Sequence, residues 1–351
     1  MSKSVLSIQS HVVHGYVGGK AAIFPLQTQG WEVDNINTVN FSNHTGYGSF
    51  KGNSIDENDE LNPILNQLIN NLHINYNAIL TGYIPNSNLI NCIGKYVKQV
   101  KEQDDKVLYL LDPVMGDNNY LYVSESCITE YQNLLTYNMI DIITPNQFEL
   151  ELLSNNKITD LNTLKLSILK LHLNFNIKYI VITSLSSSIF NPPDNEDTES
   201  NKQDDKFIYC ACSTLTNLNQ IQIFKIPIIK SYFTGVGDLF SALLLDKLYN
   251  NIHSITTTTT TTSDIEKLTR SVNQVLTIMS KTLKLTHSIG LKEFNKHKSV
   301  SSTTNSSGNI IGKINDADSM KYFELKIIES RSLYDYCGDG AFKPELLKVD
   351  Y

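Results

Sequence analysis

A glycine-rich turn leading into an apolar run is the stretch of this chain best suited to chemistry. Gly235 and Gly237 flank Val236, and Asp238 follows directly, ahead of apolar residues with helical spacing over positions 239–245. The start of a helix presents unpaired N–H groups that can bind a phosphate or a developing oxyanion, and an adjacent acid can take a proton from an attacking hydroxyl. On a purely structural interpretation, the glycines form a loop and Asp238 caps a core helix. The residues alone give both interpretations equal weight.

Two further polar pairs suit phosphate or cation chemistry. Asp112 and Asp117 are separated by a turn with a proline and a glycine, so both carboxylates can face one magnesium ion, which prefers oxygen ligands. Asn146 and Glu149 stand three residues apart at an expected helix start, where they can hold metal-bound water or phosphate. Each pair also has a structural interpretation, as strand-end and helix-capping residues, and that interpretation is favoured when either pair is taken alone.

Histidines and aromatic residues gather near the same segments. The histidines lack nearby cysteine or carboxylate spacing for zinc, so we expect them to form hydrogen bonds and pack at a pocket wall: His11, His14 and His44. Four aromatic side chains can stack on a flat ring: Tyr16, Phe41, Tyr47 and Tyr83. Core packing is a serious alternative for Phe41.

Short strand-like runs alternate with longer helix-like runs, which predicts right-handed crossovers and a mostly parallel sheet covered on both faces. The expected strands are 4–10, 33–39, 78–82, 107–111, 141–143, 179–183, 207–212 and 220–226. The expected helices are 20–29, 62–72, 87–103, 146–153, 162–175, 238–249 and 264–285. The last two strands have no helix between them and are predicted to pair antiparallel. Polar or glycine-rich residues follow most of the other strands, at the sheet edge where ligands bind in such folds.

The 351 residues suit one large α/β domain or two small ones. A net charge of −7 argues against a nucleic-acid partner, and the chain shows neither a long apolar run for a membrane span nor a signal-peptide pattern. Five cysteines without metal-ligand spacing suggest free thiols in a reducing cytoplasm. Biased composition predicts surface insertions at 191–206, 256–262 and 297–308, and 322–328 is expected to be a strand that closes the domain.

Taken together, the motifs resemble pyridoxal kinase, within the ribokinase-like fold. They occur in the family's order from Ser4 to about Tyr249: SIQSHVVHGYVG, FSNHTGYG, LTGY, DPVMGD, DIITPNQFELELL, VITS and GVGDLFSALLL. The later FELKIIES is also family-like. The resemblance implies a single three-layer α/β/α domain over 1–351, usually assembled as a homodimer. It implies transfer of the γ-phosphoryl group of ATP to the 5′-hydroxymethyl group of pyridoxal, pyridoxine or pyridoxamine.

The resemblance also assigns roles by motif. Asp238 would be the base, and the backbone from Gly235 to Gly237 the anion hole, with Val236 and Gly237 against the nucleotide. The vitamer would be held by Ser10, Thr45 and Tyr83, besides Asp238. The nucleotide and cation positions would be Asp112, Asp117, Thr144, Asn146, Glu149, Thr183 and Ser184. Among these, Asp117 would serve Mg²⁺, or another divalent ion such as Zn²⁺. A monovalent cation, K⁺ or Na⁺, would lie near Asp112, Thr144 and Thr183.

Val236 departs from the family's pattern, which commonly has threonine between these glycines. The backbone N–H groups of the turn remain, but a hydroxyl that can contact phosphate is lost, which bears on nucleotide affinity or rate. Two alternatives therefore stay open. A hydroxymethylpyrimidine kinase shares the glycine-aspartate motif, although FSNHTGY and SIQSHV favour pyridoxal. A catalytically silent vitamer-binding protein is the second, although the intact Asp238, Asp112 and Asp117 argue against it.

Overall fold

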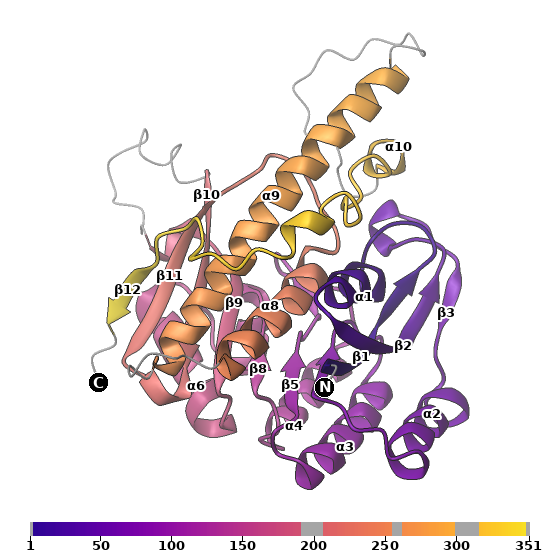
Figure 1. The fold of residues 1–351 in the computed structure, drawn as a ribbon, viewed down its shortest axis with the longest axis vertical. Coiled ribbons are helices and arrows are strands. Elements are labelled where there is room, and N and C mark those ends of the chain that lie inside the picture. Colours follow the sequence, from indigo (N-terminus) through magenta and orange to yellow (C-terminus); the bar gives the residue numbers. More distant parts are fainter. Residues whose placement is uncertain (1–2, 191–205, 255–261, 299–315, 349–351) are drawn as a thin grey trace.

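The computed structural model describes residues 3–190, 206–254, 262–298 and 316–348. Their centre is a ten-stranded sheet in the order β12-β11-β10-β9-β8-β5-β4-β1-β2-β3 (Figure 1). A separate hairpin is formed by β6 and β7. The strands are β1 (Lys3–Val12), β2 (Trp31–Phe41), β3 (Gly52–Ser54), β4 (Ala78–Thr81), β5 (Leu108–Leu111), β6 (Gly116–Asp117), β7 (Tyr120–Leu121), β8 (Ile142–Ile143), β9 (Tyr179–Leu185), β10 (Phe207–Thr214), β11 (Gln220–Pro227) and β12 (Glu345–Lys348).

The middle of the sheet is parallel, as predicted. β1 pairs with β2 and β4, and the series continues through β5 and β8 to β9, all parallel. The central strands are short and apolar because both of their faces are covered; every residue of β4 and β5 is buried. β10 and β11 form the predicted antiparallel pair, and the antiparallel strands β3 and β12 complete the two edges.

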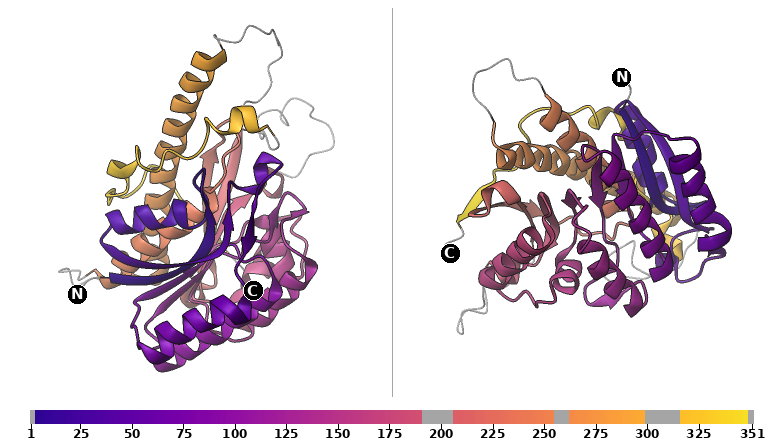
Figure 2. Two further views of the ribbon diagram at one scale, coloured as in Figure 1. Left: turned by 90° about the vertical axis from the view of Figure 1, so that its right-hand side faces the viewer. Right: turned by 90° about the horizontal axis from the view of Figure 1, so that it is seen from below.

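Helices cover both faces, which confirms the three-layer α/β/α architecture (Figures 1 and 2). Successive residues of a strand point to opposite faces, so Val5 joins the apolar cluster under α1, α8 and α9, while Leu6 joins the cluster under α3 to α6. The helices are α1 (Gly19–Thr28), α2 (Asn62–Asn66), α3 (Ser87–Gln103), α4 (Glu125–Leu135), α5 (Gln147–Ser154), α6 (Leu161–Phe175), α8 (Val236–His253), α9 (Asp264–Lys298) and α10 (Ala317–Met320).

Several boundaries differ from the sequence-based expectations. The expected helix at 62–72 is α2 flanked by π-helical turns at Glu57–Leu61 and Gln67–Asn71. The expected strand at 322–328 is wrong: its apolar residues are buried alternately, but the backbone forms turns, and β12 occupies the sheet edge instead. The predicted insertions lie almost wholly outside the described residues; the exceptions are Lys206, Thr262, and His297 and Lys298, which belong to the end of α9. No helix within the described ranges is long and apolar enough to cross a membrane.

Candidate active site

The glycine turn forms the predicted helix start. Gly235 is the N-cap of α8 with φ of 75°, and a Cβ at this position would lie 2.0 Å from the carbonyl oxygen of Tyr16. Only glycine fits such a left-handed, crowded position. Asp238 stands in the first turn of α8, and the backbone N–H of Gly18 donates a hydrogen bond to its carboxylate. Burial raises the pKa of Asp238 above its usual value.

The loop after β1 packs tightly around this acid. Gly18 has φ of 54° and is the N-cap of α1, and a Cβ there would lie 2.2 Å from both the carbonyl oxygen and the Oγ of Ser10. Ser10 is buried near the end of β1 and therefore packs directly against Gly18, the residue that bonds Asp238. The structure thus brings together the predicted base and one predicted vitamer-binding residue.

Asp112 is a buried acid at the same edge of the sheet. It follows β5, and its Oδ2 accepts a hydrogen bond of 3.0 Å from Ser241 Oγ, which lies 2.9 Å from Thr144 Oγ1. A Cβ at Gly237 would lie 3.6 Å from the same Oδ2, so the glycine turn borders this carboxylate. Burial, followed by the charges of Glu149 and Asp238, raises the pKa of Asp112 well above its usual range.

Asn146 and Glu149 form a capping box at the start of α5, as their structural interpretation predicts. They also hold the turn after Asp112. Glu149 Oε1 accepts from the backbone N–H of Met115 at 3.0 Å, and Asn146 Nδ2 donates to the carbonyl oxygen of Gly116 at 2.7 Å. Burial is the main cause that raises the pKa of Glu149 to about 8. Asp117 is exposed in β6, on the far side of that turn.

The remaining predicted residues lie near or after the carboxyl ends of other strands, at the same edge of the sheet. Thr45 is exposed in a 3₁₀ turn (Thr45–Tyr47) after β2, and Tyr83 follows β4, where its carbonyl oxygen accepts from Thr38 Oγ1 at 2.7 Å. Thr183 and Ser184 are partly buried in β9, and the Thr183 N–H donates to the carbonyl oxygen of Pro145 at 3.0 Å. The Asp238 carboxylate is hydrogen-bonded by the backbone N–H groups of Gly18 and Asp238 rather than by Ser184 or Thr45.

Val236 has a different environment from the one its motif suggests. Its side chain is partly buried and packs against the apolar cluster of α1, α8 and α9. The backbone of Val236 is the first residue of α8, so its N–H still belongs to the helix start.

The structure adds site residues that the motifs did not single out. Ser241 links Asp112 to Thr144, and it was predictable in principle, because it lies three residues after Asp238 on a helix. Thr234 Oγ1 lies 3.1 Å from Nε2 of His44, a buried residue that forms hydrogen bonds as expected. Glu324 also bonds His44, and its only sequence signal is the family-like FELKIIES segment.

The donors at this edge are mostly oxygens. No group of three or more His, Cys, Asp or Glu side chains suited to a metal ion occurs among the described residues. Asp112, Asp117 and Thr144 supply oxygen atoms, the kind of ligand that a hard cation prefers beside water and phosphate oxygens. Zn²⁺ prefers cysteine and histidine, so this donor set suits Mg²⁺ better.

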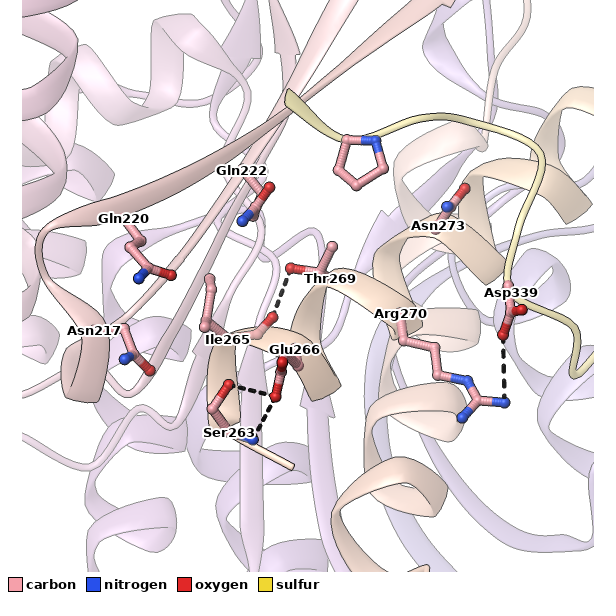
Figure 3. Close-up of a pocket in the computed structure, with 11 residues that line it drawn as sticks. Asn217, Gln220, Gln222, Ser263, Ile265, Glu266, Thr269, Arg270, Asn273 and Asp339 are labelled. Atoms are coloured by element: carbon pink, nitrogen blue, oxygen red, sulfur yellow. Dashed lines mark hydrogen bonds and ion pairs between the residues drawn. The ribbon is translucent and has the colours of Figure 1, made fainter. Parts of the chain in front are cut away.

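A groove elsewhere does not belong to this site. It has a volume of about 530 Å³ and lies between the start of β11, the first turns of α9 and the C-terminal segment (Figure 3). Its wall includes the ion pair of Arg270 with Asp339 and the capping contacts of Glu266 with Ser263. It contains none of the predicted site residues, so it carries no part of the proposed chemistry.

Comparisons with known proteins show the family of this chain. The family model described as phosphomethylpyrimidine kinase matches residues 50–267. A putative pyridoxal kinase of Saccharomyces cerevisiae is 42% identical over 334 residues, 94% of this chain and 95% of that protein. The pyridoxal kinase of Dictyostelium discoideum is 41% identical over 70% of this chain and 78% of its own length. This chain belongs to the pyridoxal kinase family.

Solved structures give the same assignment for the fold. A pyridoxal kinase from Leishmania donovani, in complex with ADP and pyridoxine, superposes with a TM-score of 0.74 at 28% identity, covering 98% of this chain and 99% of that one. The fold is therefore that of the ribokinase-like superfamily, and the chain is a phosphotransferase of the kinase class with an alcohol as acceptor.

Proposed function

We propose that this protein transfers the γ-phosphoryl group of ATP to the 5′-hydroxymethyl group of pyridoxal, pyridoxine or pyridoxamine, giving pyridoxal 5′-phosphate and the related phosphorylated vitamers. One observation carries the proposal: Asp238 stands in the first turn of α8, bonded by Gly18 and bordering Asp112 across Gly237. An acid at a helix start beside a second carboxylate suits phosphoryl transfer to an alcohol.

Each chemical step has a group in the site. The acceptor oxygen loses its proton to Asp238 as its bond to the γ-phosphorus forms, and the bond to the β,γ-bridging oxygen breaks to release ADP. The N–H groups of residues 235–238 face the charge that develops on the transferred group. Asn and Gln cannot take the place of this base, since neither amide accepts a proton near neutral pH.

The nucleotide side is assigned to the residues around Asp112. Asp112 and Asp117 would hold Mg²⁺, which neutralises phosphate charge when bound, and Asn146, Glu149, Thr183 and Ser184 would border the nucleotide. Asp112, Thr144 and Thr183 would hold a monovalent cation, K⁺ or Na⁺. The hydroxyl contact of Ser241 with Asp112 and Thr144 orients two of these groups before any ligand binds.

The vitamer side is assigned to Ser10, Thr45 and Tyr83. Ser10 packs against Gly18, which bonds Asp238, so a ring held by Ser10 lies near the base. The proposal that pyridine vitamers occupy this place is supported by the Leishmania donovani kinase, whose structures contain ADP with pyridoxine or pyridoxamine. We also infer a single-domain homodimer of the cytoplasm, an inference that the same family likeness supports. The five cysteines are free thiols.

A substrate panel tests this function. Purified protein is incubated with Mg-ATP and, separately, pyridoxal, pyridoxine, pyridoxamine and hydroxymethylpyrimidine, and ADP release is measured with each. We expect the three vitamers to be turned over at higher kcat/KM than the pyrimidine alcohol. A preference for the pyrimidine would favour a hydroxymethylpyrimidine kinase, an alternative that the description of the matching family model supports. Vitamer binding without turnover would support the silent binding protein.

A further inference from the structure

A buried carboxylate joins three segments around the site, and no role has yet been given to it. Glu324 Oε1 accepts hydrogen bonds from His44 Nε2 at 2.9 Å and from the Tyr47 hydroxyl at 2.8 Å, and its Oε2 accepts from the backbone N–H of Tyr16 at 2.9 Å. His44 and Tyr47 flank Thr45, whereas Tyr16 lies in the glycine loop that bonds Asp238. The carboxylate is 6% exposed, so its hydrogen bonds form in a low-dielectric environment.

The segment that carries Glu324 is anchored in the core. Phe323 and Leu325, on either side, are both almost completely buried, and the N–H of Lys326 donates to Thr286 Oγ1 in α9 at 3.0 Å. The fit around the carboxylate is close: Gly15 has φ of 96°, and a Cβ there would lie 2.6 Å from Glu324 Oε2. Glu324 is therefore a fixed point against which the loops around Tyr16 and Thr45 are held.

His44 carries this connection on to the glycine turn. Burial raises the pKa of Glu324, but the hydrogen bonds that Glu324 accepts from His44, Tyr16 and Tyr47 outweigh it and hold the pKa below its usual value. The carboxylate is therefore ionised, and His44 Nε2 is the donor. The same Nε2 lies 3.1 Å from the hydroxyl of Thr234, next to Gly235. On the other side of the ring, a Cβ at Gly46 would lie 3.0 Å from Nδ1, so the turn that bears Thr45 rests on the imidazole.

We propose that Glu324 is a positioning residue for phosphoryl transfer, because its hydrogen bonds fix the vitamer-binding turn and the Gly15–Gly18 loop in one arrangement beside Asp238. This inference rests on the proposed function. It makes a selective prediction: none of the hydrogen bonds of Glu324 reaches a residue assigned to the nucleotide. Losing Glu324 should therefore impair use of the vitamer far more than use of ATP.

The test compares Glu324→Ala and Glu324→Gln with the full-length wild-type protein. Removing hydrogen bonds to a charged acceptor is expected to lower kcat/KM for the vitamer by about tenfold or more in Glu324→Ala, while KM for ATP changes by less than about twofold. Glutamine keeps an oxygen acceptor for His44 and Tyr47 but places an NH₂ group against the Tyr16 N–H. Glu324→Gln should consequently recover part of the vitamer kcat/KM.

Two further variants keep the test decisive. Asp246 is another buried carboxylate, in the second half of α8, and it is bonded to Lys3, Trp31 and Asn250. Asp246→Ala should therefore lower thermal stability without a selective loss of vitamer use. If Glu324→Ala does not fold, Tyr47→Phe removes one donor to the same oxygen and should raise KM for the vitamer by about two- to fivefold.

The outcomes separate the inference from the function on which it rests. A wild-type protein that phosphorylates no vitamer overturns the proposed function. A wild-type protein that does so, combined with Glu324 variants that leave vitamer kinetics unchanged or that weaken ATP and vitamer equally, overturns the positioning role. Equal selectivity in Asp246→Ala would also overturn it, because loss of stability alone would then explain the effect.

Discussion

Replacing Val236 by threonine tests the one departure of the glycine turn from the family's motif. The isopropyl group of Val236 is partly buried and packs against the apolar cluster of α1, α8 and α9. Threonine has nearly the same shape but exchanges one methyl for a hydroxyl, which is not neutral in an apolar environment. The structure therefore predicts a less stable protein with unchanged affinity for ATP.

The magnitude follows from two contributions. The lost methyl forfeits about 0.8 kcal/mol when fully buried, and a buried hydroxyl without a partner costs about 1–3 kcal/mol. Because Val236 is only partly buried, about half of each applies, which gives a loss of about 1–2 kcal/mol in the free energy of unfolding. For 351 residues with an unfolding entropy of about 2.1 cal/mol/K per residue, the expected fall in Tm is about 2 °C.

The assay measures the Kd for ATP by titration and Tm by calorimetry on the wild type, Val236→Thr and Val236→Ala. Alanine removes the packing without adding a hydroxyl, so it should lower Tm and also leave the Kd unchanged. A hydroxyl that reached phosphate would instead add a hydrogen bond worth about 0.5–1.5 kcal/mol, which tightens ATP binding by roughly two- to twelvefold. Tighter binding without a fall in Tm would refute the core-facing orientation of residue 236.

Three other predictions concern the base, the glycine turn and a buried histidine. Asp238→Asn should lower kcat by about 10²–10⁴-fold with ATP binding retained, and near-normal turnover in single-turnover assays would remove Asp238 from the base role. Gly235→Ala should abolish turnover or folding, since its Cβ would lie 2.0 Å from the Tyr16 carbonyl oxygen; an active, stable variant would contradict this geometry. Burial lowers the pKa of His172 from 6.5 to about 4, so the unfolded chain binds a proton that the native protein does not. Stability should therefore fall as the pH drops from about 6.5 to about 4, by about 3 kcal/mol in urea titrations, and His172→Gln should show less of this dependence.

The sequence predicted the centre of the fold because its signals there are local. Strands such as β4 and β5 are continuous apolar runs, and glycine or proline residues mark their ends. The motifs at those ends led to Asp112, Asn146 and Asp238, which the structure does bring to one edge of the sheet. The capping box of Asn146 and Glu149 was likewise visible as a three-residue spacing.

The rest depends on contacts between distant parts of the chain. Residues 323–327 alternate between apolar and polar, which resembles a strand, but alternation does not say whether a neighbouring strand is available for pairing. β12 has four residues and is mostly exposed, so it gives almost no hydrophobic signal. Glu324 bonds residues 280 and 308 positions earlier in the chain, and no spacing within one sequence reveals such a partner.

Identification of the product by ³¹P NMR and mass spectrometry, after incubation of the wild-type protein with pyridoxal and Mg-ATP, is the most direct test of the central claim. We predict one ADP for each pyridoxal consumed, with the new phosphate ester on the 5′-hydroxymethyl oxygen, and no such product from Asp238→Asn within the same time. ADP accompanied only by inorganic phosphate, or a phosphorylated pyrimidine alcohol in place of phosphorylated pyridoxal when both acceptors are offered, would contradict it.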